Sequence, residues 1–263
     1  MTSLFKIAAS GAVFLLLSLA NLVVLYYLVS YPPIQFFYDA VPPAGPSSVY
    51  VPGSGFSGFW FHLGALSSIQ DLHKFDYYCY SSGCLSVVMA AMNISVGEAT
   101  TMATDVQQLW MVGNITRFDI IDQFLLDVLG EDSDEGNQII ESFLPNLKIL
   151  VTSRGNGVEI VQPTSRDELI SALKQTTWIP FITGQGVFRA STNDTCSNAE
   201  ENEFYLDGAF SRVLHPTCEY DLLVPGTFRT LMLTLHPGLS REDVDQLWEA
   251  GRNFEHPLLL ASQ

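Results

Sequence analysis

Residues 77–85, with the sequence YYCYSSGCL, decide the expected fold, because they join an aromatic, strand-like run to an apolar, helical run that ends near Met92. A serine at a sharp strand-to-helix turn projects its oxygen away from the backbone, and the second residue after it must be small because strand and helix crowd there. Ser81 and Gly83 occupy these two positions, so Ser81 is a candidate nucleophile. A Ser-Ser-Gly turn is also common at the start of a helix without catalysis, and this stretch alone leaves that alternative open.

A glycine-rich loop precedes this turn, between an expected strand at Ser48–Pro52 and an expected helix at Phe59–Leu66. Gly53, Gly55 and Gly58 form the pattern GxGxxG, which is typical of a dinucleotide site. Such a site also needs an acidic residue at the end of the second strand, and here that strand ends in Ser-Ser-Gly, which argues against nucleotide binding. Backbone N–H groups of glycines at the start of a helix can instead bind an oxyanion.

A third feature is an aspartate at the end of a short expected strand, Phe204–Leu206, which leads into Asp207-Gly208-Ala209. Asp-Gly is also a common turn, so Asp207 by itself indicates no catalytic role. The remaining periodicity predicts helices between Ser95 and Pro145, strands at 147–152, 157–161 and 228–235, and helices that begin near Ser165 and Ser240.

The glycine loop, the serine turn and the aspartate together resemble the patatin-like phospholipase family, whose marks are GGGxRG, GxSxG and DG[GA]. The resemblance covers Ser48 to Gly226 and includes Trp178-Ile179-Pro180, where the family usually has a helix that ends in a proline. It implies an α/β fold, namely a three-layer α/β/α sandwich around a central, mostly parallel sheet. It also implies a Ser-Asp dyad without histidine, and we expect no cofactor.

By this resemblance Ser81 would be the nucleophile and Asp207 the residue that activates it, while the amides around Gly53, Ser54 and Gly55 would bind the oxyanion. The hydroxyl of a serine needs a base within hydrogen-bond reach, and a partly desolvated aspartate can serve. The expected function is therefore a serine lipid acyl hydrolase of the phospholipase A or acylglycerol lipase type.

Three positions depart from the family pattern: Ser54 replaces the second glycine of the loop, Ser57 replaces its arginine, and Cys79 replaces the glycine before the nucleophile. Ser54 is compatible with the loop only if its backbone needs no positive φ. The missing arginine weakens the expectation of family-like efficiency, so a lipid-binding patatin-like pseudoenzyme is the main alternative.

Two further readings concern side chains outside these motifs. A Ser-Asp-His triad of the α/β-hydrolase type is a third alternative, and its candidate histidines are His215, His236 and His256. Aromatic residues after the glycine loop would suit an apolar mouth for an acyl chain or, alternatively, the core; they are Phe56, Phe59, Trp60 and Phe61.

Residues 8–30 are almost wholly apolar and long enough to cross the roughly 30 Å hydrocarbon core of a bilayer. A cleaved signal peptide would have a shorter apolar region, so we expect an uncleaved transmembrane signal-anchor between a short cytosolic tail at 1–7 and a proline-rich linker at 31–47. The catalytic domain would then span 48–263. Lys6 precedes the anchor, which places the amino terminus in the cytosol and the domain in the lumen or outside the cell.

The composition excludes some partners. The 263 residues include 12 Lys and Arg against 28 Asp and Glu, and the net charge of −16 argues against nucleic acid. No CxxC pair or histidine cluster exists, so we expect no metal site. The expected ligand is a membrane lipid, and Asn93, Asn114 and Asn193 lie in acceptor sequons for N-glycans.

The four cysteines also fit an oxidising compartment. We expect a disulfide between Cys196 and Cys218, across the segment that carries Asp207. Cys79 and Cys84 flank the serine turn, and we expect them to be buried free thiols that pack as small apolar residues.

Overall fold

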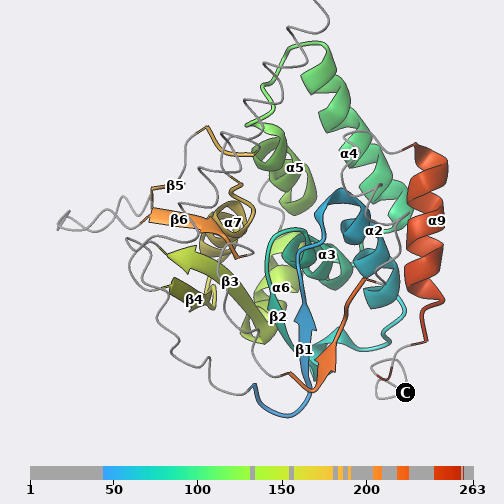
Figure 1. Cartoon of the computed structure of the whole chain (residues 1–263), viewed down its shortest axis with the longest axis vertical. Coiled ribbons are helices and arrows are strands. Elements are labelled where there is room, and N and C mark those ends of the chain that lie inside the picture. Colours follow the sequence, from blue (N-terminus) through green and yellow to red (C-terminus); the bar gives the residue numbers. More distant parts are fainter. Residues whose placement is uncertain are drawn as a thin grey trace, which may run out of the picture.

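The computed structural model describes residues 44–130, 134–153, 157–179, 183–185, 189–190, 204–208, 218–224, 240–255 and 257 (Figure 1). The expected membrane anchor at 8–30 and the expected strand at 228–235 lie outside these residues. Within them, no helix combines the length and the hydropathy needed to cross a bilayer.

The described chain is an α/β fold with a mixed sheet and helices on both sides (Figure 1). The strands are β1 (Ser48–Val51), β2 (Asp76–Cys79), β3 (Leu147–Ser153), β4 (Gly157–Val161), β5 (Arg189–Ala190), β6 (Phe204–Asp207) and β7 (Tyr220–Asp221). Their order is β5-β6-β3-β2-β1-β7, and β4 also pairs with β3.

The direction of the strands corrects the expectation of a mostly parallel sheet. β7, β1, β2 and β3 run parallel, whereas β4 and β6 run antiparallel to β3, and β5 runs antiparallel to β6. Only residues 154–156 separate β3 from β4. Because a parallel neighbour needs a crossover of a dozen or more residues, so short a connection imposes an antiparallel pair.

Helices α4, α7 and α9 begin where the sequence predicts them, whereas α2 begins at Gly55, four residues before the expected Phe59. They are α2 (Gly55–Leu66), α3 (Ser82–Ala91), α4 (Val96–Met111), α5 (Ile120–Leu129), α6 (Asp134–Phe143), α7 (Arg166–Thr176) and α9 (Arg241–Arg252), with short 3-10 turns η1 (Leu72–Lys74) and η2 (Leu144–Asn146). Ser95 and Ser240 cap α4 and α9 with capping boxes, and the Ser165 hydroxyl caps α7. These caps confirm the predicted starts.

The main core lies between one face of the sheet and the helices. Along β1 and β2, Val49, Val51, Tyr77 and Cys79 point into it, whereas the alternate residues belong to a smaller cluster of Tyr50, Tyr78 and Leu150. Phe59, Trp60 and Phe61 are 7%, 5% and 3% exposed. These aromatics are therefore part of the interior and form no apolar mouth, and the side chain of Phe56 lies outside the described residues.

Helix α2 is fixed closely against α9. A Cβ atom on Gly64 would collide with the Trp248 carbonyl, and one on Gly251 would collide with the Phe61 carbonyl. The two backbones can approach so closely only because both positions are glycine. This contact anchors the helix whose first residues belong to the glycine-rich loop.

Candidate active site

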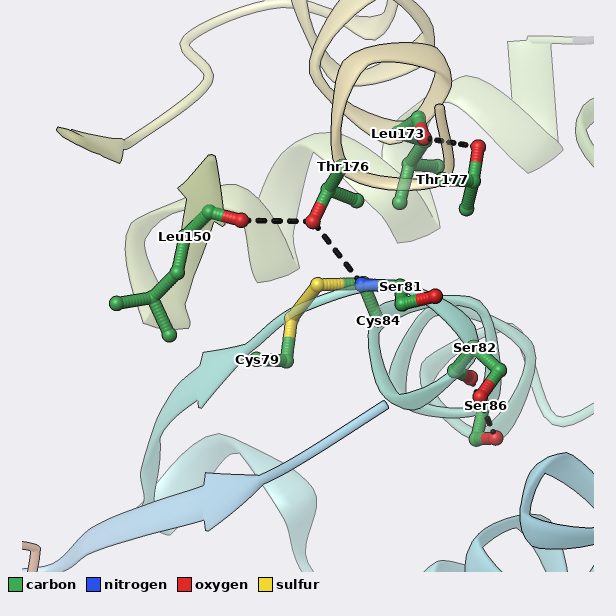
Figure 2. The surroundings of a disulfide bond; sticks show 9 residues. All are labelled: Cys79, Ser81, Ser82, Cys84, Ser86, Leu150, Leu173, Thr176 and Thr177. Atoms are coloured by element: carbon green, nitrogen blue, oxygen red, sulfur yellow. Dashed lines mark hydrogen bonds between the residues drawn. A yellow bond between two sulfur atoms is a disulfide. The ribbon is translucent and has the colours of Figure 1, made fainter. Parts of the chain in front are cut away.

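The serine turn has the predicted strand-turn-helix geometry. β2 ends at Cys79, α3 begins at Ser82, and Ser81 between them has φ 51° and ψ −136°. A positive φ is unfavourable for a residue with a side chain, and such a conformation persists only where its surroundings enforce it. The hydroxyl of Ser81 points away from the cysteines on either side of the turn (Figure 2).

Crowding at this turn explains why Gly83 must be small. A Cβ atom on Gly83 would lie 2.6 Å from the Pro52 carbonyl oxygen and closer still to that of Val51, so α3 could not approach β1 with a larger residue here. A Cβ atom on Gly53 would lie 2.6 Å from the Cβ atom of Ser81. The glycine-rich loop and the serine turn are therefore packed directly against each other.

The sheet brings Asp207 to the same place. β4 pairs with residues 149–153 of β3 along one edge. β2 pairs with residues 147–149 and β6 with residues 151–153, so both lie on the other edge. β2 ends with Cys79 opposite Ile149, and β6 approaches from the other direction with Asp207 opposite Val151. Only two positions along β3, about 7 Å, separate these strand ends.

Contacts at this junction hold Asp207 firmly. It is 1% exposed, its N–H donates to the Trp178 carbonyl at 2.9 Å, and its own carbonyl accepts from the Thr152 hydroxyl at 2.9 Å. A Cβ atom on Gly208 would lie 2.6 Å from the Cβ atom of Tyr80. The residue that follows Asp207 therefore packs against the residue that precedes Ser81.

Two tyrosines complete the junction, and the sequence patterns gave no signal for them. Burial raises the pKa of Tyr80, and the nearby Asp207 carboxylate raises it further, while hydrogen bonds from Tyr50 and from the Gly53 backbone act in the opposite direction. Burial also raises the pKa of Tyr50. Both phenols are therefore neutral at physiological pH, and Tyr80 lies between the glycine-rich loop and the aspartate.

Ser54 fits the loop only on the condition that its backbone needs no positive φ, and the structure meets this condition. Ser54 has φ −142°, which any residue can adopt, whereas Gly55 has φ 62° and so occupies the position that favours glycine. The amide of Ser54 donates to the Ser82 hydroxyl at 3.0 Å. Its expected role as an oxyanion donor therefore requires that this hydroxyl move aside, whereas Gly55 begins α2, where first-turn amides have no partner within the helix.

Ser57, which stands where the family has arginine, is 0% exposed in the first turn of α2. It cannot replace a cation at the entrance of a site.

The cysteines pair differently from the prediction. Cys79 and Cys84 form a disulfide across the serine turn, with their Cα atoms 5.0 Å apart (Figure 2), so the expectation of two free thiols is wrong. The turn reverses the chain, which brings two cysteines five positions apart within bonding distance. Cys218 is a free thiol, which contradicts the expected bridge to Cys196, a residue outside the described part of the chain. Burial raises the pKa of Cys218 to about 11.

Histidine has no demonstrated part in this site. His215, His236 and His256, the candidates for a triad, lie outside the described residues. His62 on α2 is fully buried, its Nε2 lies 3.0 Å from the Leu222 carbonyl, and burial lowers its pKa to about 4. This neutral ring ties α2 to the segment after β7 and has a structural role.

The described residues also contain no group of three or more His, Cys, Asp or Glu side chains that could hold a metal ion. A cavity of about 170 Å³ lies between the start of α5 and the end of α7; its lining is Phe118, Asp119, Ile121, Asp122, Lys174, Thr177, Trp178, Thr183 and Gln185. Lys174 and Asp122 form an ion pair at 3.1 Å within this lining, so the cavity offers no unpaired lysine to an anion.

The site is thus a junction at which a glycine-rich loop, a serine in a strained turn and a buried aspartate meet. Acyl-transfer enzymes in general use a serine nucleophile, a nearby base and backbone amides that bind the oxyanion. No family model matches the chain, and no curated protein and no solved structure matches it either.

Proposed function

We propose that this chain is a membrane-anchored serine lipid acyl hydrolase that cleaves carboxylic ester bonds of glycerophospholipids or acylglycerols. The observation that carries the proposal is the junction on β3, where Asp207 at the end of β6 meets the positive-φ turn of Ser81 at the end of β2. Ser81 is the nucleophile, and Asp207 accepts its proton. The resemblance to patatin-like enzymes supports the same two roles and a three-layer α/β/α arrangement.

The chemistry follows from the positions of these groups. Ser81 Oγ attacks the carbonyl carbon of the ester, its proton passes to Asp207, and backbone amides of the loop that includes Gly53 and Gly55 bind the charge on the carbonyl oxygen. In other acyl-transfer enzymes one such donor contributes about 2.7 to 4 kcal/mol. The alcohol then leaves with a proton, and water hydrolyses the acyl-enzyme on Ser81.

The lipid substrate and the membrane location rest on the apolar stretch at 8–30, which can serve as a signal-anchor for a lumenal or extracellular domain at 48–263. Attachment to a bilayer keeps an esterase beside substrates that are nearly insoluble in water. No cofactor is needed, because nucleophile, base and oxyanion donors all come from the chain.

The test is an activity assay of the full chain with phospholipid and with triacylglycerol, beside Ser81→Ala and Asp207→Asn. We expect each variant to lose at least about 100-fold in kcat, since each removes a group that acts in the transition state. A fluorophosphonate probe should label the wild type at Ser81. Equal hydrolysis by all three proteins would exclude the dyad.

A lipid-binding pseudoenzyme is the second candidate, and the bond from the Ser54 amide to the Ser82 hydroxyl favours it, because this bond occupies one expected oxyanion donor. Ser57 in place of arginine favours it too. Binding of lipid vesicles without fluorophosphonate labelling and without hydrolysis would identify this function.

A Ser-Asp-His triad is the third candidate. If it were present, replacement of one of His215, His236 or His256 by Gln would abolish the activity and leave the fold intact. The dyad predicts that all three replacements leave the activity in place.

A further inference from the structure

At the junction on β3, the backbone carbonyl of Leu150 accepts a hydrogen bond from a side chain outside the sheet. β2 pairs with β3 as far as Ile149, and β6 begins to pair at Val151, so the carbonyl of Leu150 faces the gap between the two strand ends. A Cβ atom on Gly208 would lie 2.6 Å from this oxygen, which places the gap beside Asp207 and Tyr80. A buried carbonyl of this kind needs a donor from elsewhere.

Thr176, the last residue of α7, supplies the donor. Its hydroxyl donates to the Leu150 carbonyl at 2.7 Å and accepts from the Ser81 N–H at 3.0 Å (Figure 2). A hydroxyl has one hydrogen and two lone pairs, so both bonds can be made at once. The Thr176 side chain is 0% exposed, and no water molecule would readily take its place.

We propose that Thr176 is a positioning residue that holds Ser81 in its reactive conformation. The Ser81 amide lies before the first residue of α3, so the helix itself cannot bind it, and the positive φ of Ser81 needs support from its surroundings. Thr176 provides that support by fastening the amide to β3 through Leu150.

The same segment also fixes the aspartate. Two residues after Thr176, the Trp178 carbonyl accepts the Asp207 N–H at 2.9 Å. Residues Thr176 and Trp178 therefore each form one hydrogen bond to a residue of the proposed dyad, so a displacement of this segment would move both Ser81 and Asp207. A shift of the nucleophile by about 1 Å can lower the rate of an enzyme about 100-fold without removing any reacting group.

Thr177 offers a matched control. Its hydroxyl is also buried and donates at 2.7 Å, but to the Leu173 carbonyl within α7, and it has no bond to Ser81. Thr177→Val removes the same atoms from the next position, so the difference between the two variants reports the loss of the bridge that Thr176 forms between Ser81 and Leu150.

The inference rests on the proposed function where activity is read, so the experiment has two arms. In the first arm, kcat and KM for a phospholipid ester and the rate of fluorophosphonate labelling are measured for Thr176→Val, Thr176→Ser and Thr177→Val. We expect Thr176→Val to lower kcat and the labelling rate by about 10- to 100-fold with KM unchanged, and Thr176→Ser to restore them. Thr177→Val should match the wild type.

The second arm measures hydrogen exchange of the Ser81 amide, which does not depend on activity. It should exchange faster in Thr176→Val than in Thr177→Val, with the amides of α3 unchanged. Equal kcat for the two valine variants in an active enzyme, or an unaltered Ser81 exchange rate, would overturn the positioning role. If Thr176→Val fails to fold, Thr176→Ala removes the same hydroxyl without adding a methyl group beside the Leu150 carbonyl. A wild type without hydrolysis or labelling would refute the proposed function alone, and the exchange arm would still decide the role of Thr176.

Discussion

Ser81 combines a strained backbone with a position that a catalyst would need. A residue with a side chain at φ 51° and ψ −136° lies in a sparsely populated region and costs about 1 to 3 kcal/mol, whereas glycine adopts positive φ freely. Hydrogen bonds from Gly83 N to the Tyr80 carbonyl and from Cys84 N to the Ser81 carbonyl, each 3.1 Å long, hold the turn in addition to Thr176. The strained backbone of Ser81 therefore lowers the stability of the fold at the residue whose hydroxyl we propose as the nucleophile.

A prediction at this scale compares two replacements of that serine. Both Ser81→Gly and Ser81→Ala remove the hydroxyl, but only glycine relieves the positive φ, so we expect Ser81→Gly to be more stable than Ser81→Ala by about 1 kcal/mol. The measurement is the free energy of unfolding from urea denaturation followed by circular dichroism, with equal m-values as a control. An alanine variant at least as stable as the glycine variant would show that Ser81 is unstrained.

At the level of elements, the disulfide ties the end of β2 to the first turn of α3. Reduction frees a loop that joins residues five positions apart, and for so short a loop the chain-entropy relation gives a stabilisation of about 2 kcal/mol. We expect Cys79→Ser with Cys84→Ser to lower the free energy of unfolding by at least that amount. Both sulfur atoms are buried, so the two new hydroxyls add a further cost.

The free thiol gives the control for this prediction. Cys218→Ser should leave the effect of a reducing agent unchanged, because Cys218 belongs to no disulfide. If the double variant were as stable as the wild type, or if the reducing agent had no effect on the wild type, the bridge would be absent under the conditions used.

The same elements show what a sequence can predict and what it cannot. The strand-turn-helix at Ser81 and the starts of α4, α7 and α9 follow from local signals, namely periodicity and capping residues, and these predictions are confirmed. The mixed sheet depends on pairing between distant segments, and no local pattern shows that β6 joins β3 on the edge that β2 leaves.

The site divides in the same way. Gly83 could be identified because a strand and a helix crowd together at this turn and leave room only for glycine, and Gly53 because it belongs to the glycine-rich pattern. Thr176 could not be identified from the sequence, because a threonine at the end of a helix is common. Only the fold shows that it contacts the Ser81 amide, which lies 95 positions earlier in the chain. The two cysteines that flank the turn could be seen in the sequence, but only the reversal of the chain in the structure shows that they form a disulfide.

For the whole molecule, the disulfide and two exposed sequon asparagines are compatible with the compartment that we propose. A bridge between Cys79 and Cys84 persists in an oxidising lumen or outside the cell, where we propose that the domain lies. Asn93 and Asn114, two of the three sequon residues, are exposed, and Asn193 lies outside the described residues. A net charge of −16 also suits a neutral membrane surface better than a strongly anionic one.

The last prediction concerns this topology. If the domain from Ser48 onward enters the lumen, glycosidase treatment of the protein from its native host should increase its electrophoretic mobility, and Asn93→Gln and Asn114→Gln should each remove one step of the shift, because both side chains are accessible to a glycan. In sealed vesicles with the cytosolic side out, the domain should resist added protease until detergent is present. Ser95→Thr, which keeps the Asn93 sequon, is the matched control and should leave the shift in place. A protein without a shift whose domain is digested in intact vesicles would place the domain in the cytosol, and the membrane orientation proposed here would be reversed.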